Sequence, residues 1–140
     1  MAVVMTPFDD PQAELAWMFM QSMCEGGDLD EGFALLSDDF TYWSIVTRQA
    51  YDKQTLRRAV ERRKKVFEVN IELRRCVNEG ETVVVEGYCD GLTVDGARYD
   101  SPFVFIFDTR DGMIVSLREY SDTQSLAQVY PEAGAASGSP

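Results

Sequence analysis

The segment MIVSLREYSDT, residues 113–123, joins a strand-like pattern to a carboxylate that could exchange protons. Branched residues alternate at its start, and Arg118, Glu119 and Asp122 follow before the pattern ends. The chain has no histidine, which excludes Ser-His-Asp and Cys-His catalysis and disfavours a zinc site. Acid–base chemistry would therefore fall to Asp, Glu, Tyr, Lys or Cys, and Glu119 is the first candidate.

The side of the sheet on which Glu119 lies follows from the hairpin turns. A two-residue loop at Asp95-Gly96 and a three-residue loop at 110–112 predict the facing residues. In this register Phe103 faces Glu119 on one neighbouring strand and Tyr88 on the other. Glu119 is then predicted to point inward, on the face that helices need for packing. That face carries Tyr99, Ser101, Phe103, Phe105 and Phe107.

A carboxylate among aromatic rings should resist ionisation, because burial disfavours its charged form. Glu119 would then be available as a proton donor or acceptor near neutral pH. Two other interpretations remain open at this point. A register shifted by one residue would make Glu119 a solvated strand residue, and an arginine could pair with it inside the protein.

Other side chains on the same predicted wall could assist Glu119. Glu86 could share a proton with it, and Tyr42 or Tyr88 could donate a hydrogen bond to a substrate oxygen or a water. Ordinary packing explains the two tyrosines equally well. The predicted catalytic residues are Glu119, Tyr42, Glu86 and Tyr88. The predicted substrate-binding residues are Trp17, Met20, Ser44, Ser101, Phe103, Phe105, Leu117 and Ser121. We expect no metal and no cofactor.

These residues need an α+β scaffold with helices packed on one face of a bent antiparallel sheet. The expected helices span 9–24, 29–36, 53–67 and 123–130, and the expected strands span 39–46, 67–77, 82–94, 97–108 and 113–122. One domain, 9–130, would lie between a flexible N-terminus, 1–8, and a disordered tail, 131–140. Six basic residues on the third helix are predicted to be a solvated face: Arg57, Arg58, Arg62, Arg63, Lys64 and Lys65.

Composition limits the partners. The chain has 140 residues and a net charge of −11, which argues against nucleic acids and anionic membranes. No apolar run is long enough to span a bilayer, and the first residues do not resemble a signal peptide. Cys24, Cys76 and Cys89 are expected to be free thiols in a reducing compartment, so we expect a cytoplasmic protein.

The outer sheet face is also predicted to be apolar, and the helices cannot cover both faces. We therefore expect a second copy of the chain to cover it and form a homodimer. The residues assigned to this outer face are Val83, Val85, Cys89, Pro102, Val104, Ile106 and Ile114.

The motifs GDLDEGFALLSDDFTYW and DGMIVSLREYSD, with a basic helix between them, resemble the nuclear transport factor 2-like superfamily. The resemblance covers about residues 10–130. It implies the cone-shaped fold of ketosteroid isomerases, SnoaL-like polyketide cyclases and limonene epoxide hydrolases, in which helices pack on the concave face of a strongly bent antiparallel sheet. The fold carries many chemistries, so the reaction must be argued from individual residues.

The resemblance to ketosteroid isomerases does not extend to their functional groups. Their tyrosine, general-base aspartate and oxyanion-hole aspartic acid correspond to Phe19, Ser44 and Phe103. Steroid isomerisation by that mechanism is therefore not expected.

The resemblance to limonene epoxide hydrolases is partial. Tyr42 matches their strand-one tyrosine, and Glu119 matches their water-activating aspartate. Their middle-strand arginine corresponds to Glu86, so the charge-balanced triad is incomplete. SnoaL-like cyclases also use an acid on the last strand, a role that suits Glu119 equally.

Two classes of function stay open. The first is a cofactor-free enzyme acting on a small, largely apolar, oxygenated substrate, as a cyclase, isomerase, dehydratase or epoxide hydrolase. The second is a non-catalytic domain that binds a small ligand or serves as a dimeric scaffold. A deep cavity with Glu119 at its base would favour the first, and a cavity filled by aromatic side chains would favour the second.

Overall fold

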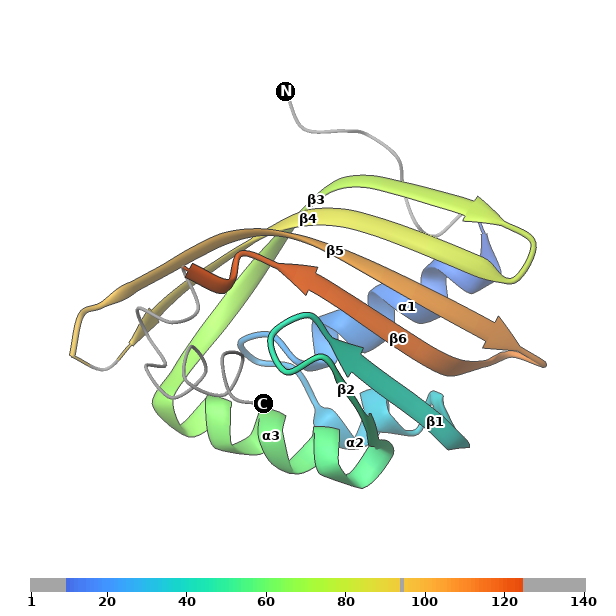
Figure 1. Ribbon diagram of the computed structural model, residues 1–140, viewed down its shortest axis with the longest axis horizontal. Coiled ribbons are helices and arrows are strands. Elements are labelled where there is room, and N and C mark those ends of the chain that lie inside the picture. The colour runs from blue at the N-terminus through green and yellow to red at the C-terminus, as the bar shows by residue number, and fades with distance from the viewer. Residues whose placement is uncertain (1–9, 94, 125–140) are drawn as a thin grey trace.

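A computed structural model describes residues 10–93 and 95–124, which form a curved sheet over three helices (Figure 1). The helices are α1 (Pro11–Ser22), α2 (Leu29–Phe33) and α3 (Lys53–Val66). The strands are β1 (Leu36–Ser44), β2 (Gln49–Asp52), β3 (Phe67–Glu79), β4 (Thr82–Thr93), β5 (Arg98–Arg110) and β6 (Met113–Ser121). The predicted N-terminal segment at 1–8, most of the predicted helix at 123–130 and the predicted tail at 131–140 lie outside the described residues.

The sheet confirms the α+β class, and its strand order is β2-β1-β6-β5-β4-β3. It is mixed, because β1 pairs in parallel with β6 while the other neighbours are antiparallel. Alternation along a strand shows which residues share a face but not the direction of its neighbour, so the sequence did not reveal this parallel pair. The sequence also missed β2, whose four residues, Gln49–Asp52, are too few to show a pattern.

Asp10 and Asp52 cap the N-termini of the two longer helices. The Ala13 amide donates to Asp10 Oδ2 at 2.9 Å, with Pro11 in the first turn, and the Thr55 amide donates to Asp52 Oδ1 at 2.8 Å. These caps fix where α1 and α3 start beneath the sheet, and so which of their side chains reach its inner face.

Phe19 of α1 lies at the centre of the core, with 0% of its surface exposed. Its ring centroid lies 5.5 Å from that of Phe33, 6.5 Å from that of Phe40 and 6.3 Å from that of Phe107. These contacts join α1 to α2, β1 and β5 through aromatic packing. They fill one end of the space beneath the sheet and leave the other end for a cavity.

The predicted register between β4 and β5 is wrong by one residue. Phe103 faces Gly87 rather than Tyr88. The Thr93 amide donates to the Ala97 carbonyl at 2.8 Å, so three residues form the loop, not two. The extra residue exchanges the two faces of β4. Glu86 and Tyr88 consequently lie on the outer face of the sheet.

The register between β5 and β6 differs from the prediction by two residues, which leaves the face unchanged. Glu119 faces Phe105, and Phe103 faces Ser121. The loop is the two-residue pair Asp111-Gly112, both at positive φ, and a bulge follows near the start of β6. The prediction that Glu119 shares the phenylalanine-rich face is therefore confirmed.

The bulge and the shift in β4 also correct the predicted outer face. Val83, Val85 and Ile114 are inner core residues, with 0%, 2% and 0% of their surfaces exposed. Cys89 lies on the inner side as well, whereas Pro102, Val104 and Ile106 remain outside. Cys76 faces Val85, and all three cysteines are free thiols, as predicted.

Replacing Gly87 by alanine should lower the free energy of unfolding by about 1–3 kcal/mol, a typical cost of overpacking. A Cβ atom there would lie 2.6 Å from Phe103 Cζ and 2.8 Å from the Glu72 carbonyl oxygen, so backbone or ring must move. Urea denaturation measures the change. The neighbouring exposed substitution Glu86→Ala is the control, expected within about 0.5 kcal/mol of wild type. An equally stable Gly87→Ala variant would contradict the observed register.

Candidate functional site

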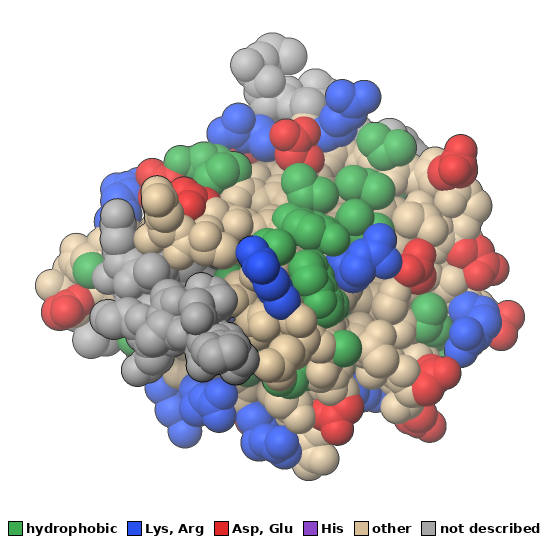
Figure 2. Space-filling model, viewed as in Figure 1, with side chains coloured by type: hydrophobic (Ala, Val, Ile, Leu, Met, Phe, Trp, Pro, Cys, Tyr) green, Lys and Arg blue, Asp and Glu red, His purple; other side chains and the backbone are tan. Residues whose placement is uncertain are grey.

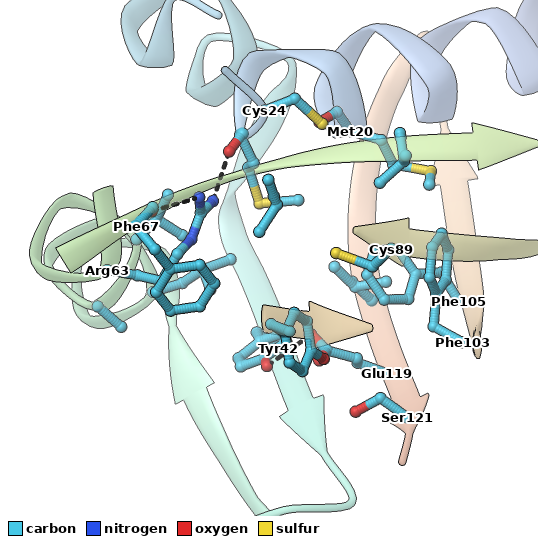
Figure 3. A pocket seen from close by; sticks show the side chains of 18 residues that line it. Met20, Cys24, Tyr42, Arg63, Phe67, Cys89, Phe103, Phe105, Glu119 and Ser121 are labelled. Carbon is cyan, nitrogen blue, oxygen red and sulfur yellow. Dashed lines mark hydrogen bonds between the residues drawn. The ribbon is translucent and has the colours of Figure 1, made fainter. Parts of the chain in front are cut away.

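A cavity of about 230 Å³ lies between the inner face of the sheet and helices α1 and α3 (Figure 3). Most of its wall is apolar. Its aromatic rings are those of Tyr42, Phe67, Tyr99, Phe103 and Phe105. The remaining space shows that these rings line the cavity without filling it.

Tyr42 and Glu119 form a hydrogen-bonded pair in this wall. The Tyr42 hydroxyl donates to Glu119 Oε1 at 2.8 Å. The parallel pairing of β1 with β6 brings the two together, because it sets Tyr42 opposite Leu117 and Ser44 opposite Glu119. The sequence predicted both side chains, but their contact depends on a strand pairing that it did not reveal.

Burial raises the pKa of Glu119 above its ordinary value, because the protein surrounds the carboxyl group and replaces its water. Hydrogen bonds from Tyr42 and Ser121 and the positive charge of Arg63 act in the opposite direction without overcoming this effect. Burial, followed by the nearby Glu119 charge, raises the pKa of Tyr42 well above its usual range. The pair therefore holds its protons more tightly, and Glu119 keeps its acid form to a higher pH than an exposed glutamic acid does.

Two further hydroxyl groups lie at the cavity wall. Ser121 follows Glu119 on the inner face, and its buried Oγ lies close enough to the Glu119 carboxyl group to lower the pKa of that group by hydrogen bonding. Tyr99 of β5 is 7% exposed, and burial raises its pKa. Each hydroxyl group could also form a hydrogen bond with a polar ligand in the cavity. Tyr99 was placed on this face by the sequence but was not predicted as a site residue.

The thiols of Cys24 and Cys89 also line the cavity. Burial raises the pKa of Cys89 to about 12 and also raises the pKa of Cys24. Both groups therefore stay protonated near neutral pH, which does not suit a thiolate nucleophile.

Arg63 of α3 is a cavity residue, contrary to its predicted place on a solvated helix face. Its side chain is 16% exposed and donates to the Met23 carbonyl oxygen. Leu56, Val60 and Arg63 follow one another at spacings of four and three residues, so they share the inward face of α3. That spacing was a readable signal, which the surrounding run of basic residues obscured.

Seven of the twelve predicted site residues line the cavity: Met20, Tyr42, Phe103, Phe105, Leu117, Glu119 and Ser121. Three others do not line the cavity, although a hydrogen bond with Ser44 acts on the Tyr42 hydroxyl group. Ser44 is buried and its Oγ accepts a hydrogen bond from the Val46 amide at 3.1 Å, while Ser101 Oγ accepts from the Asp122 amide at 3.2 Å. Trp17 borders a separate groove beside α1 and α2.

Glu86 and Tyr88 are the two predicted catalytic residues that do not lie in the cavity. Both lie on the outer face because of the extra loop residue described above, and Glu86 is exposed. The Arg74 guanidinium lies 5.2 Å from the centre of the Tyr88 ring, and a hydrogen bond with Asp100 raises the pKa of Tyr88. The expected pair of Glu86 and Glu119 does not form.

The described part of the chain contains no cluster of three or more His, Cys, Asp or Glu side chains arranged to hold a metal ion. Within the same residues, no helix is both long enough and apolar enough to cross a membrane.

Comparisons with known proteins identify relatives of this architecture. The SnoaL-like domain model matches residues 18–117, and no curated protein matches the chain. A solved LEH-like epoxide hydrolase from M. tuberculosis has a TM-score of 0.72 and 18% identity, with 90% of this chain and 93% of that chain covered. A Shewanella putrefaciens protein assigned as a SnoaL-like polyketide cyclase has a TM-score of 0.75 and 14% identity, with coverages of 94% and 98%.

A third solved structure is a protein from Catenulispora acidiphila with a ketosteroid isomerase-like fold, in complex with trimethylamine. It has a TM-score of 0.71 and 18% identity, and the match covers 91% of this chain and 94% of that chain. All three structures are less than 25% identical to this chain. They establish the shared fold, and the chemistry must be argued from this chain's own residues.

Proposed function

The chain belongs to the SnoaL-like domain family, and from this membership and the cavity we propose that it is a cofactor-free acid–base enzyme. Its substrate would be a small, largely apolar, oxygenated molecule, and its reaction that of an isomerase, cyclase, dehydratase or epoxide hydrolase. One observation carries the proposal. The Tyr42 hydroxyl donates at 2.8 Å to the carboxyl group of Glu119, which is buried in the wall of a largely apolar cavity.

In the proposed reaction Glu119 exchanges a proton with the substrate or with a water beside it. The ionised carboxylate would accept a proton from a carbon next to a carbonyl group, or from a water that attacks the substrate. The resulting carboxylic acid would return the proton to another substrate carbon or to a departing oxygen. A general base with a pKa near the working pH serves both directions, and the raised pKa of Glu119 moves it toward that range.

Tyr42 would position Glu119 rather than react with the substrate. Its hydroxyl group binds Oε1 and so orients the carboxyl plane, leaving Oε2 for proton exchange. The buried hydroxyl groups of Tyr99 and Ser121 would bind a substrate oxygen on which negative charge develops.

A non-catalytic ligand-binding domain is the second candidate, and the size of the cavity favours it. At about 230 Å³ the cavity is smaller than pockets for drug-sized ligands, which span about 300–1,000 Å³. In that case the hydrogen bond from Tyr42 would only satisfy a buried carboxyl group.

A turnover screen separates these two candidates. Wild-type protein and the Glu119→Gln variant would be incubated with small apolar epoxides, unsaturated ketones and tertiary alcohols, and products followed by mass spectrometry. Product formation that needs Glu119 supports the enzyme. Binding of the same molecules, with equal affinity in both proteins and no product, would support the binding domain.

We also propose that the chain forms a homodimer through the outer face of its sheet. Apolar side chains gather at the centre of this face, with basic side chains on either side (Figure 2). The apolar patch consists of Trp43, Val77, Val84, Val104, Ile106 and Tyr120, of which Val77 and Tyr120 are 45% and 37% exposed. Arg75, Arg118 and Glu86 lie among these residues, so a second copy can meet it with opposite charges.

Val104→Asp at the centre of this patch should convert the dimer to a monomer, because a charge in an apolar interface loses its water without a partner. Light scattering at micromolar concentration measures the molar mass. Val66→Asp makes the same change on α3, at a residue 39% exposed, and should leave the dimer intact. A wild-type protein that is monomeric under these conditions would rule out the proposed dimer.

We propose a reducing compartment such as the cytoplasm for the protein, because Cys24, Cys76 and Cys89 are all free. The net charge of −11 supports the further proposal that neither nucleic acid nor an anionic membrane is a partner.

A further inference from the structure

Arg63 brings a positive charge into the wall of an apolar cavity, in a chain whose net charge is −11. It is the one cationic side chain among the described residues that line this cavity. Figure 3 shows its guanidinium beside Phe67, on a different side of the cavity from Tyr42 and Glu119. A charge in such a place loses much of its hydration, so it calls for a partner of opposite sign.

The partners that Arg63 already has do not account for its place in the cavity. Its guanidinium binds the Met23 carbonyl oxygen, and at 3.5 Å it contacts both the Phe67 carbonyl oxygen and Glu68 Oε1. A guanidinium has five N–H groups, so within the described part of the chain some of them remain without a partner. Glu68, its partner in an ion pair, is itself 38% exposed.

The neighbouring Lys64 shows that a basic side chain of α3 can bind a carbonyl group at the end of α1 without entering the cavity. Lys64 Nζ donates to the Cys24 carbonyl oxygen at 2.8 Å and to Glu68 Oε1 at 3.4 Å. It performs this role from a separate surface groove, outside the cavity. Arg63 contacts the adjacent carbonyl group of Met23 and also presents its charge to the cavity.

We propose that the ligand of this cavity is a small apolar carboxylate whose anionic group binds Arg63. Its apolar body lies against Phe103 and Phe105, which directs its far end toward Glu119. The planar fork of a guanidinium matches the two oxygens of a carboxylate, and hydrogen bonds between two charged groups are the strong ones. The inference deepens the proposed function and rests on it for the reaction at Glu119, but not for the binding itself.

Glu119 does not occupy this anion site itself. The structure places it in a hydrogen bond with Tyr42, and the described ion pair of Arg63 is with Glu68. The cavity therefore separates a cation at one side from a carboxyl group that resists ionisation at another. A neutral ligand would leave the charge of Arg63 without an anionic partner inside the cavity, whereas a carboxylate would supply one.

A matched pair of probes tests this inference: 3-phenylpropionate and 3-phenylpropanamide, which have closely similar shapes and differ in charge. Isothermal titration calorimetry should show that wild-type protein binds the carboxylate at least about tenfold more tightly than the amide. The Arg63→Met variant should lose this preference. Arg62→Met removes the same charge from the adjacent, exposed position of α3 and should keep it.

Equal affinities for the two probes in wild-type protein, or a preference that survives in Arg63→Met, would overturn the inference. If Arg63→Met does not fold, as judged by circular dichroism, Arg63→Lys replaces it. Lysine keeps the charge without the planar fork, so the preference should fall by about threefold or more. An unchanged preference in Arg63→Lys would then count against the proposed bidentate contact.

These experiments test the proposed anion site and the proposed enzyme activity separately. The Glu119→Gln variant should lose turnover but still bind the carboxylate more tightly than the amide, because the proposed contact with the anion is made by Arg63. A carboxylate preference without any turnover would support the anion site and count against the enzyme. Turnover of neutral substrates, with no carboxylate preference, would do the reverse.

Discussion

Replacing Glu119 by glutamine should lower turnover by about 10²–10⁴-fold, the usual contribution of a positioned general acid or base. The amide has nearly the same shape as the carboxyl group, and its oxygen can still accept the hydrogen bond from Tyr42 that is 2.8 Å long in the wild type. The amide cannot exchange a proton at neutral pH. The cavity should therefore stay intact while the chemistry is lost.

Two control variants make this result specific. Glu31→Gln makes the same change at an exposed residue of α2, outside the cavity, and should leave turnover unchanged. Tyr42→Phe should lower turnover less than Glu119→Gln does, because it removes the orientation of the carboxyl group but not its proton exchange. Full activity in Glu119→Gln, with its fold verified by circular dichroism, would exclude Glu119 as the acid–base residue.

The sequence placed Glu119 correctly although the predicted partner was wrong. Its expected neighbour was Phe103 and its observed neighbour is Phe105, a shift of two residues that restores the same face. Side chains alternate along a strand. A register error of two residues therefore leaves a side chain on the same face of the sheet, whereas an error of one residue moves it to the other face. The predicted register of Glu86 was wrong by one residue, because the loop between β4 and β5 holds one residue more than the two-residue loop predicted at Asp95-Gly96. Glu86 therefore lies on the opposite face from the one predicted.

The contacts that complete the site come from elements far apart in the sequence. Tyr42 and Glu119 are 77 residues apart and meet only because β1 runs parallel to β6. Arg63 reaches the cavity because one face of α3 points toward the sheet. The run of basic residues around Arg63 made this face difficult to recognise in the sequence. Local pattern thus predicted the three helices and five of the six strands in the described residues, whereas the direction of one strand and the rotation of one helix determined the site.

Glu119 should also make the folded protein less stable as the pH rises. Its pKa in the folded state is raised above the ordinary value of 4.5, so the folded protein binds a proton more tightly than the unfolded chain does. Stability from this group is fully present below about pH 4.5 and is lost as the pH rises through the folded pKa. Each unit by which the folded pKa exceeds the unfolded one corresponds to about 1.4 kcal/mol.

The Glu119→Gln variant should remove this loss, because an amide has no proton to release in this range. Its stability relative to wild type, measured between about pH 5 and about pH 9, should therefore increase until the Glu119 carboxyl group of the folded wild type has ionised, by an amount set by the raised pKa. This interval avoids Asp39, Asp52 and Asp95, whose pKa values are lowered from 3.8. It also avoids the tyrosines, Tyr42 among them, whose ordinary pKa is 10.0.

Urea denaturation of both proteins across this interval measures the difference in the free energy of unfolding. The Glu31→Gln variant serves as the control, because it removes a carboxyl group from an exposed position of α2 outside the cavity. A difference for Glu119→Gln that does not change with pH would mean that the Glu119 carboxyl group ionises as readily in the folded protein as in the unfolded chain. The apolar wall around it would then not hold the proton that the proposed chemistry requires.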